Sequence, residues 1–279
     1  MGVAVQSHWF SVGSVVVAAS AGVGAIATQA NPDLSHKPRG LAMLRDGMSA
    51  AEVSTALLVD DPAAAHRQFA VVDMHGGAVG YTGRSCIPAA GNVTGDGYVC
   101  QANMMRNDTV WSSMATAFEG TGGEFIGRLL AALDAAQSVG GDLRGQQSAA
   151  ILVAPAVGGE ADYLIDLRVE DHPTPLVELR RLVTLQRAYV FADEADALVA
   201  HGDFDAAAGR YVDAHGIAPD NDELRFWAGL GLISAGHPER GLELLRASIA
   251  ADESWHELLG RLDPASVPAS TEALRLLAP

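Results

Sequence analysis

The order of strand-like and helix-like segments constrains the fold of this chain more than any other feature. Helical patterns occur in pairs, at about residues 38–46 and 49–57 and again at 107–118 and 124–138. Apolar, β-branched runs typical of strands lie around these pairs, at 2–6, 12–18, 22–29, 68–73, 78–82, 148–154 and 163–169. Strands that meander between helix pairs indicate antiparallel sheets with helices on their outer faces, rather than a parallel doubly wound sheet. We therefore expect an α+β domain over residues 1–187.

Residues 188–279 contain no strand pattern and predict a small all-α domain. Gly202 and Gly236 each stand in a turn that opens a helix, and they lie 34 residues apart. This spacing is the period of tetratricopeptide repeats, of which fewer than three do not stack into a free solenoid. We expect this short helical domain to rest on the first domain or on a second copy of the chain, so a homodimer is predicted.

Charge and cysteine content exclude several classes of function. The formal net charge of −16 argues against a nucleic-acid or anionic-membrane partner, because both require a basic face. The two cysteines, Cys86 and Cys100, are too few for a disulfide framework, and no metal-ligating motif or cofactor fingerprint is present. We therefore expect neither a metal nor a cofactor. The apolar stretch 12–27 has no Lys or Arg before it and is too short for a membrane span, so we expect a cytoplasmic protein.

Several segments taken together, in this order, resemble one bacterial family. The segments are 2–7 with 12–16, then 22–30, then 82–91 with Cys86 and Pro88, then 101–104, then 140–148 and 166–172. This combination is similar to the Ntn-hydrolase-like family catalogued as domain of unknown function 1028, over roughly residues 1–187. Members of that family sometimes carry a C-terminal helical module that is labelled as peptidoglycan-binding.

The resemblance implies a four-layer αββα sandwich and a particular kind of nucleophile. Ntn hydrolases use an N-terminal Thr, Ser or Cys, whose own α-amino group, with a pKa near 8, accepts the proton. Here Gly2 has no side chain, and the chain begins at what resembles the second strand of the family. Either the start is assigned too late or the first strand and its chemistry are lost. We favour the first alternative, because a missing strand leaves a costly open sheet edge.

The turn 142–148 carries three candidate residues. By the resemblance, Asp142 supports the amine of the nucleophile through a charge-assisted hydrogen bond; the alternative is a solvated turn closed by an Asp side chain. Arg144 either binds a substrate carboxylate in bidentate fashion or forms a structural ion pair. Gln147 is a further candidate for substrate binding.

The remaining candidates lie at strand ends. Ser7 and His8 follow the first strand, where the superfamily often carries a supporting catalytic residue, although His8 can equally be a packed histidine. Thr28 and Gln29 end the third strand near the same rim and are candidates for substrate binding. Asn103 can supply an amide to an oxyanion hole, or can serve only a turn.

Two functions from different classes remain open. The first is an Ntn-type enzyme that hydrolyses an amide or related C–N bond of a small molecule. The second is a catalytically inactive sandwich that serves as a binding or assembly scaffold, with a cell-wall role as a variant of it. A Thr, Ser or Cys behind an in-frame upstream start would favour the enzyme.

Overall fold

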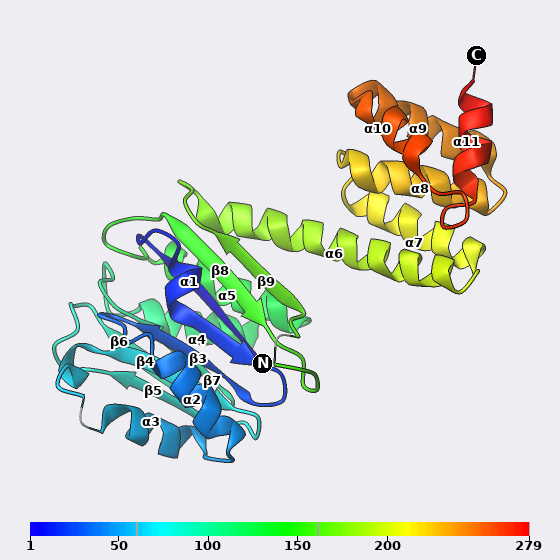
Figure 1. The fold of residues 1–279 in the computed structure, drawn as a ribbon. Helices are drawn as coiled ribbons and strands as arrows, with labels where there is room; N and C mark the ends of the chain where they lie inside the picture. The colour runs from blue at the N-terminus through cyan, green and yellow to red at the C-terminus, as the bar shows by residue number, and fades with distance from the viewer. Residues whose placement is uncertain (60, 161, 279) are drawn as a thin grey trace. The chain divides into compact units, whose positions relative to one another are not determined.

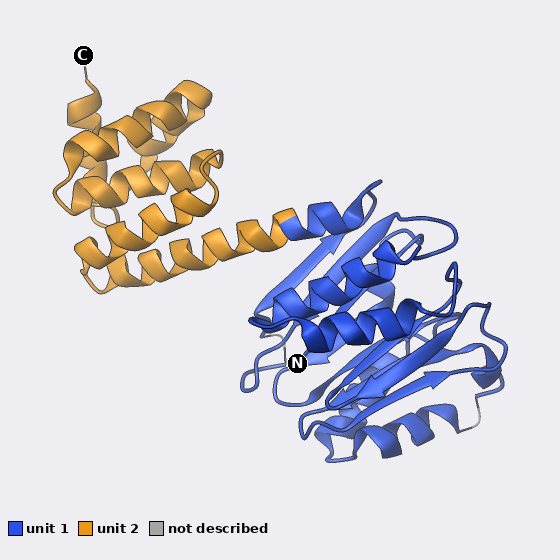
Figure 2. Ribbon diagram, turned by 180° about the vertical axis from the view of Figure 1, so that it is seen from behind, with its two compact units in different colours: residues 1–180 blue, residues 181–279 orange. Residues whose placement is uncertain are grey.

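The computed structural model describes every residue except 60, 161 and 279, and the described residues form two compact units. The first unit, Met1–Arg180, combines α-helices with antiparallel sheets, whereas the second, Arg181–Pro279, is helical (Figure 2). A mixed α+β domain followed by a helical region is therefore confirmed. Within the described residues, no helix is long and apolar enough to cross a membrane.

The strands of the first unit form three antiparallel groups (Figure 1). One sheet has the order β1-β8-β9, formed by Gly2–Ser7, Ser148–Val153 and Ile165–Val169. A second sheet has the order β2-β3-β4-β5, formed by Val17–Ser20, Gly24–Gln29, Gln68–Asp73 and Ala78–Thr82. The third is a hairpin of β6, Gly91–Gly95, and β7, Tyr98–Ala102. In the first sheet Ser7 lies opposite Ser148, so the end of β1 meets the start of β8.

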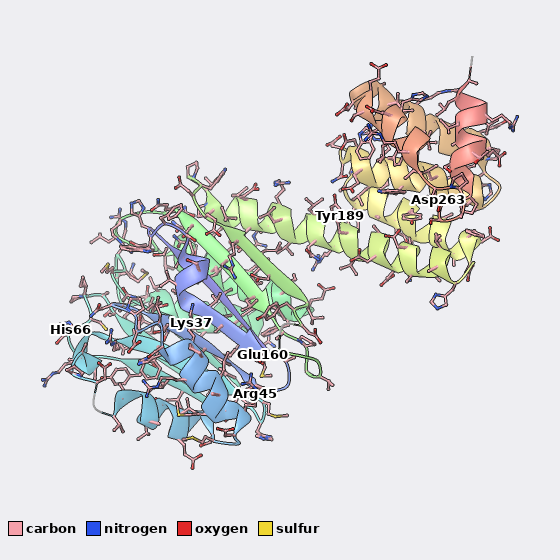
Figure 3. The ribbon with its side chains drawn as sticks, viewed as in Figure 1. Lys37, Arg45, His66, Glu160, Tyr189 and Asp263 are labelled. Carbon is pink, nitrogen blue, oxygen red and sulfur yellow. The ribbon has the colours of Figure 1, made fainter. Side chains whose placement is uncertain are left out.

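Two pairs of helices cover the strands. The helices α2, His36–Arg45, and α3, Ala50–Leu58, pack against β3, β4 and β5. The helices α4, Val110–Gly120, and α5, Phe125–Ser138, pack against β6, β7 and β1. Because β1 also contacts β2 and β3, strands lie between the two helix pairs. An ion pair of 3.1 Å between Arg45 and Glu160 joins α2 to the segment before β9 (Figure 3).

The start of α3 shows how local sequence fixes an element. The Ser49 side chain accepts from the backbone N–H of Glu52, and the Glu52 carboxylate accepts from the backbone N–H of Ser49 at 2.8 Å. This reciprocal capping box satisfies two donors that a helix start leaves without intrahelical partners. The helix predicted from Ser49 is therefore confirmed.

Two predicted segments differ from the structure. The expected strand over 12–18 is instead a short helix, α1, over Val12–Val16, followed by β2. Val12 and Val16 are both buried one helical turn apart, and the Val12 N–H donates to the Ser148 hydroxyl, so tertiary contacts outweigh β-branched propensity. The region 83–103, for which the sequence predicted neither a helix nor a strand, contains the β6-β7 hairpin. Its Asp96-Gly97 turn, with Gly97 at a φ of 71°, is a hairpin signal that the sequence prediction missed.

The C-terminal helices share a core of their own. The long helix α6, Pro175–Ala200, begins in the first unit and continues into the second. It is followed by α7, Phe204–Ile217; α8, Asp222–Ser234; α9, Pro238–Ala251; α10, Ser254–Arg261; and α11, Ala269–Leu277. Phe226, Leu230 and Leu245 are buried at the centre of the last four helices. Gly202 and Gly236 both adopt φ 79°, a left-handed conformation that suits the turns between these helices.

Candidate functional site

A cavity of about 930 Å³ runs through the first unit. Its walls come from β1, β3, β4, β7, α4 and α5, and most of its lining side chains are apolar. Five of the eight predicted site residues line it: Ser7, Gln29, Asn103, Asp142 and Arg144. An apolar cavity with a few convergent polar groups is the usual form of a small-molecule site.

The turn at Asp142 supplies the charged part of this lining. Asp142 is only 5% exposed, and its carboxylate accepts from Arg144 Nε at 3.0 Å and from Arg144 Nη2 at 2.7 Å. The backbone N–H groups of Arg144 and His8 donate to the same carboxylate, at 2.9 and 3.4 Å. The hydrogen bond to Asp142 raises the pKa of Arg144 above its ordinary value. Asp142 is therefore a buried anion that joins the end of β1 to this turn, and Arg144 is its ion-pair partner.

Gln68, the first residue of β4, organises the neighbouring polar groups. Its fully buried side-chain oxygen accepts from Gln29 at 2.7 Å and from Asn103 at 3.0 Å. Its side-chain nitrogen donates to Thr82 Oγ1 at 2.8 Å and to the carbonyl oxygen of Ala102 at 2.9 Å. The side chains of Gln29 and Asn103 are thus held at one end of the cavity. An amide nitrogen carries two protons, so Asn103 retains one that is available to a ligand.

Ser7 and His8 do not form a nucleophile–base pair. The Ser7 carbonyl accepts from the Gln147 N–H at 3.0 Å, which closes the end of the β1-β8 ladder. The His8 ring is exposed, and its Nδ1 lies 3.3 Å from the carbonyl oxygen of Gln146. Among the described residues, no hydrogen bond joins the Ser7 hydroxyl to the His8 ring. His8 is also outside the cavity lining, so its contribution to this end of the site is its backbone N–H to Asp142.

Two further predicted residues lie away from the cavity. Thr28 is only 1% exposed on β3 and does not line the cavity, since its neighbour Gln29 takes the opposite face of the strand. Gln147 donates to Asp171 Oδ1 at 3.1 Å and is likewise absent from the lining. The alternation of side chains along β3 explains why Thr28 does not line the cavity. The position of Gln147 instead depends on the packing of two distant loops.

Sequence reasoning missed two polar groups inside the cavity. Gln6 and Gln101 both line it, and the buried atoms Gln6 Nε2 and Gln101 Oε1 have no hydrogen-bond partner. Both are glutamines on otherwise apolar strands, which is the signal that could have found them. A buried donor or acceptor without a partner carries a substantial desolvation cost, so both atoms mark positions where a ligand could bind.

Burial disfavours the thiol that lines the cavity as a nucleophile, and potential metal ligands do not cluster among the described residues. Cys100 lines the cavity, but burial, together with the nearby Glu119, raises its pKa to about 12. The thiol is therefore protonated at neutral pH and is a poor nucleophile. Within the part of the chain that the structure describes, no group of three or more His, Cys, Asp or Glu side chains is arranged to hold a metal ion.

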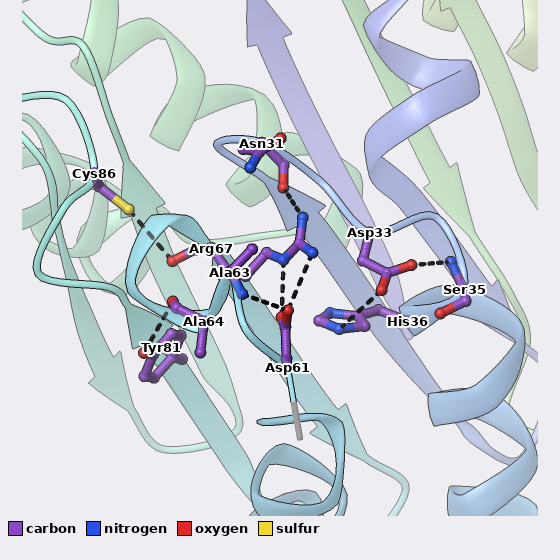
Figure 4. A network of polar contacts seen from close by, with 10 residues as sticks. All are labelled: Asn31, Asp33, Ser35, His36, Asp61, Ala63, Ala64, Arg67, Tyr81 and Cys86. Carbon is purple, nitrogen blue, oxygen red and sulfur yellow. Dashed lines mark hydrogen bonds and ion pairs between the residues drawn. The ribbon is translucent and has the colours of Figure 1, made fainter. Parts of the chain in front are cut away.

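A second polar network stabilises the segment that leads into α2 and β4 (Figure 4). Arg67 donates to Asp61 through Nε at 2.9 Å and Nη2 at 3.2 Å, and also to the carbonyl oxygen of Asn31. The His36 ring is completely buried, packs edge-on against Phe69 and has no hydrogen-bond partner on either nitrogen. Burial lowers the pKa of His36 below its ordinary value, although Asp33 opposes this shift.

The fold and the cavity define a mixed α+β protein with antiparallel sheets, a largely apolar cavity and a separate helical unit. Residues 1–179 match the family of unknown function DUF1028, and the chain belongs to that family. A similar solved structure is that of a Silicibacter pomeroyi protein described under the same family. It shares 31% sequence identity at a TM-score of 0.59, and the match covers 65% of this chain and 78% of that one. The comparison with curated proteins gave no match.

Proposed function

We propose that this protein is an Ntn-type hydrolase that cleaves an amide or related C–N bond of a small molecule. The observation that carries the proposal is the buried Asp142 carboxylate, which lines one end of a 930 Å³ apolar cavity together with Ser7 and Asn103. A buried carboxylate beside apolar walls is suited to hold an ammonium group, because the low local dielectric strengthens the interaction. The arrangement of helix pairs around the strands also fits the αββα sandwich of this class.

In this proposal the nucleophile is the side chain of an N-terminal Thr, Ser or Cys that lies beside Asp142. Its free amine takes the proton of the hydroxyl or thiol as the oxygen or sulfur attacks the substrate carbonyl carbon. The same proton then passes to the departing amine as the C–N bond breaks, and water hydrolyses the acyl-enzyme. The free N–H of Asn103 would donate to the oxyanion. Gly2 cannot be this nucleophile because it has no side chain.

The mature N-terminus decides the proposal. Protein produced from its native locus, with the upstream region included, is analysed by intact-mass spectrometry and N-terminal sequencing. An N-terminal Thr, Ser or Cys ahead of Met1 supports the hydrolase. Its replacement by Ala should then abolish turnover of a panel of chromogenic amides, while the folded structure stays unchanged. Any other mature N-terminus rules out the hydrolase.

The alternative is a catalytically inactive scaffold that binds a partner or assembles with other copies. One observation favours it, namely that both oxygens of Asp142 are already engaged by Arg144. A carboxylate satisfied in this way can be purely structural. The predictions of a tetratricopeptide-like helical unit, a cell-wall role and a homodimer belong to this alternative. Sedimentation velocity tests the homodimer, and a pull-down with peptidoglycan tests the cell-wall role.

A further inference from the structure

The strand β9 forms one edge of its sheet, and this edge is unpaired. Among the described residues, β9 pairs only with β8, and β1 lies on the other side of β8 (Figure 1). In the part of the chain that the structure describes, no backbone group of Ile165–Val169 forms a backbone hydrogen bond outside the β8-β9 ladder. An open row of N–H and C=O groups is a template for pairing with another strand. The edge of β9 is therefore a candidate docking surface for a strand.

The sequence of β9 contains little that prevents such pairing. It has no proline and no lysine, and it pairs with β8 in continuous register, without the bulge that often protects an edge. Its charged residues are Asp166 and Arg168, which lie two positions apart and therefore share one face of the strand. Arg168 donates to Asp166 through Nε at 3.2 Å and Nη2 at 3.3 Å, and both side chains remain more than a third exposed. The two charges cancel, so the edge itself does not repel a second copy.

The order of residues along β9 is complementary to itself. In a twofold interface the same surface of each copy is used, so that a residue that contacts a second one is matched by the reciprocal contact. When two β9 strands pair antiparallel with their Leu167 residues opposite each other, Asp166 of each copy lies opposite Arg168 of the other. Ile165 of each copy likewise lies opposite Val169 of the other. Opposite charges and β-branched apolar side chains that face each other across a ladder both stabilise a sheet.

No other twofold register of β9 is as favourable. Residues directly opposite each other present their side chains on the same face of the sheet, so the axis must pass through a residue. An axis at Asp166 sets two carboxylates against each other, and an axis at Arg168 does the same with two guanidinium groups. An axis at Ile165 or Val169 leaves the rest of the strand beyond the end of its partner. The register centred on Leu167 alone pairs all 5 residues of β9.

Exposed apolar side chains flank β9 on both sides along the chain. Tyr163 and Leu164, just before the strand, are 42% and 58% exposed, and Val177 in the first turn of α6 is 67% exposed. Antiparallel pairing brings the segment before β9 of one copy beside the segment after β9 of the other, and the twofold axis repeats this contact. Pairing would therefore shield apolar surface at both ends of the shared ladder, in addition to satisfying the open edge.

We propose that this protein forms a homodimer in which the β9 strands of two copies pair antiparallel about a twofold axis at Leu167. The two sheets then join into one continuous sheet with the order β1-β8-β9-β9-β8-β1. A second copy is the occupant because the charge pattern of β9 is matched by its own reverse. The ladder is short, so we expect micromolar rather than nanomolar affinity. Since no residue of β9 lines the cavity, the dimer does not depend on hydrolysis.

Charge reversal in the full chain tests the interface. Asp166→Arg and Arg168→Asp each set like charges opposite each other twice in the dimer, so each should weaken dimerisation by about tenfold or more. Sedimentation velocity from about 1 µM to 1 mM protein measures the dissociation constant. Arg261→Asp is the matched control, because it also breaks an exposed ion pair, with Glu257 on α10, and should leave dimerisation unchanged. Hydrogen exchange of residues 165–169 in the parent chain should slow by about tenfold or more as the dimer forms.

A mixture of the two single variants separates the contact between copies from the ion pair within one copy. Each variant has lost its own ion pair between positions 166 and 168, but the mixed dimer sets two acidic side chains of one variant opposite two basic side chains of the other. Heterodimers with about the affinity of the parent are therefore expected. A monomeric parent chain, a dimer that neither reversal weakens, or a mixture that stays monomeric would each overturn the inference. These outcomes are separate from the intact-mass test of the hydrolase.

Discussion

The side-chain nitrogen of Asn103 donates to the side-chain oxygen of Gln68 at 3.0 Å. The bond ties the end of β7 to the first residue of β4, two strands from different sheets. Asn103 thereby keeps a fixed orientation at the end of the cavity, where Gln29 is held by the same oxygen at 2.7 Å. One buried side chain thus positions two of the predicted site residues.

Replacement of Gln68 should destabilise the first unit. Gln68→Leu preserves the volume but leaves the amide groups of Gln29 and Asn103 without their acceptor. Each buried polar group left unpaired costs on the order of 1–3 kcal/mol. Equilibrium urea denaturation, followed by tryptophan fluorescence and circular dichroism, measures the loss. Gln147→Leu serves as the control because Gln147 bonds to an exposed carboxylate, and a loss equal to that of Gln68→Leu would contradict the assignment.

The Asp142–Arg144 pair can be compared with a second pair of the same spacing. Asp166 and Arg168 form an ion pair at 3.2 Å, but the Asp166 side chain is 35% exposed against 4% for Asp142. Asp142→Asn should cost about 1–3 kcal/mol, because it weakens a buried charge-assisted network. Asp166→Asn should cost no more than about 1 kcal/mol. Thermal and chemical denaturation of both variants would test this. Equal losses in the free energy of unfolding would show that burial of Asp142 does not strengthen its contribution to stability.

His36 should make the first unit less stable as the pH falls. Its folded pKa lies below the ordinary value of 6.5, chiefly because of burial. Below pH 6.5 the unfolded chain therefore binds a proton that the folded chain does not, so stability is full above this pH and is lost as the pH falls towards the folded pKa. Asp33, Asp61, Arg39 and Arg67 contribute the charges around the ring.

The measurement is the free energy of unfolding between pH 7.5 and pH 5 for His36→Leu and the parent chain. The variant should lose the part of the pH dependence that comes from this ring. An identical slope for His36→Leu and the parent would show that His36 is not the titrating group.

The capping box of α3 should contribute measurably to stability. Ser49→Ala removes the acceptor for the Glu52 N–H and should cost about 1 kcal/mol. Ser35 precedes α2 without a side-chain capping bond, so Ser35→Ala is the matched control and should have little effect. Chemical denaturation of the two variants provides the comparison, and a larger loss for Ser35→Ala would be inconsistent with the capping assignment.

Local patterns in the sequence determined most elements of this protein. The apolar, β-branched runs of β4 and β5, the capping box at Ser49 and the glycine turns at Gly202 and Gly236 all depend on neighbouring residues, so they were predictable. The order of the elements likewise indicated antiparallel sheets and a helical end. The resemblance to a known family located the Asp142 turn, because its segments occur in a fixed order along the chain.

Only the tertiary structure decided how distant residues meet. Val12–Val16 is helical because it packs against β8 and bonds to Ser148, a residue more than a hundred positions away. Gln68 becomes a hub because three separate segments converge on it, and the Asp142 turn is buried because the end of β1 and the chain after β7 both reach it. The cavity is lined by residues of β1, β3, β4, β7, α4 and α5 together and belongs to none of these elements alone. Such features depend on long-range packing, which no local sequence pattern encodes.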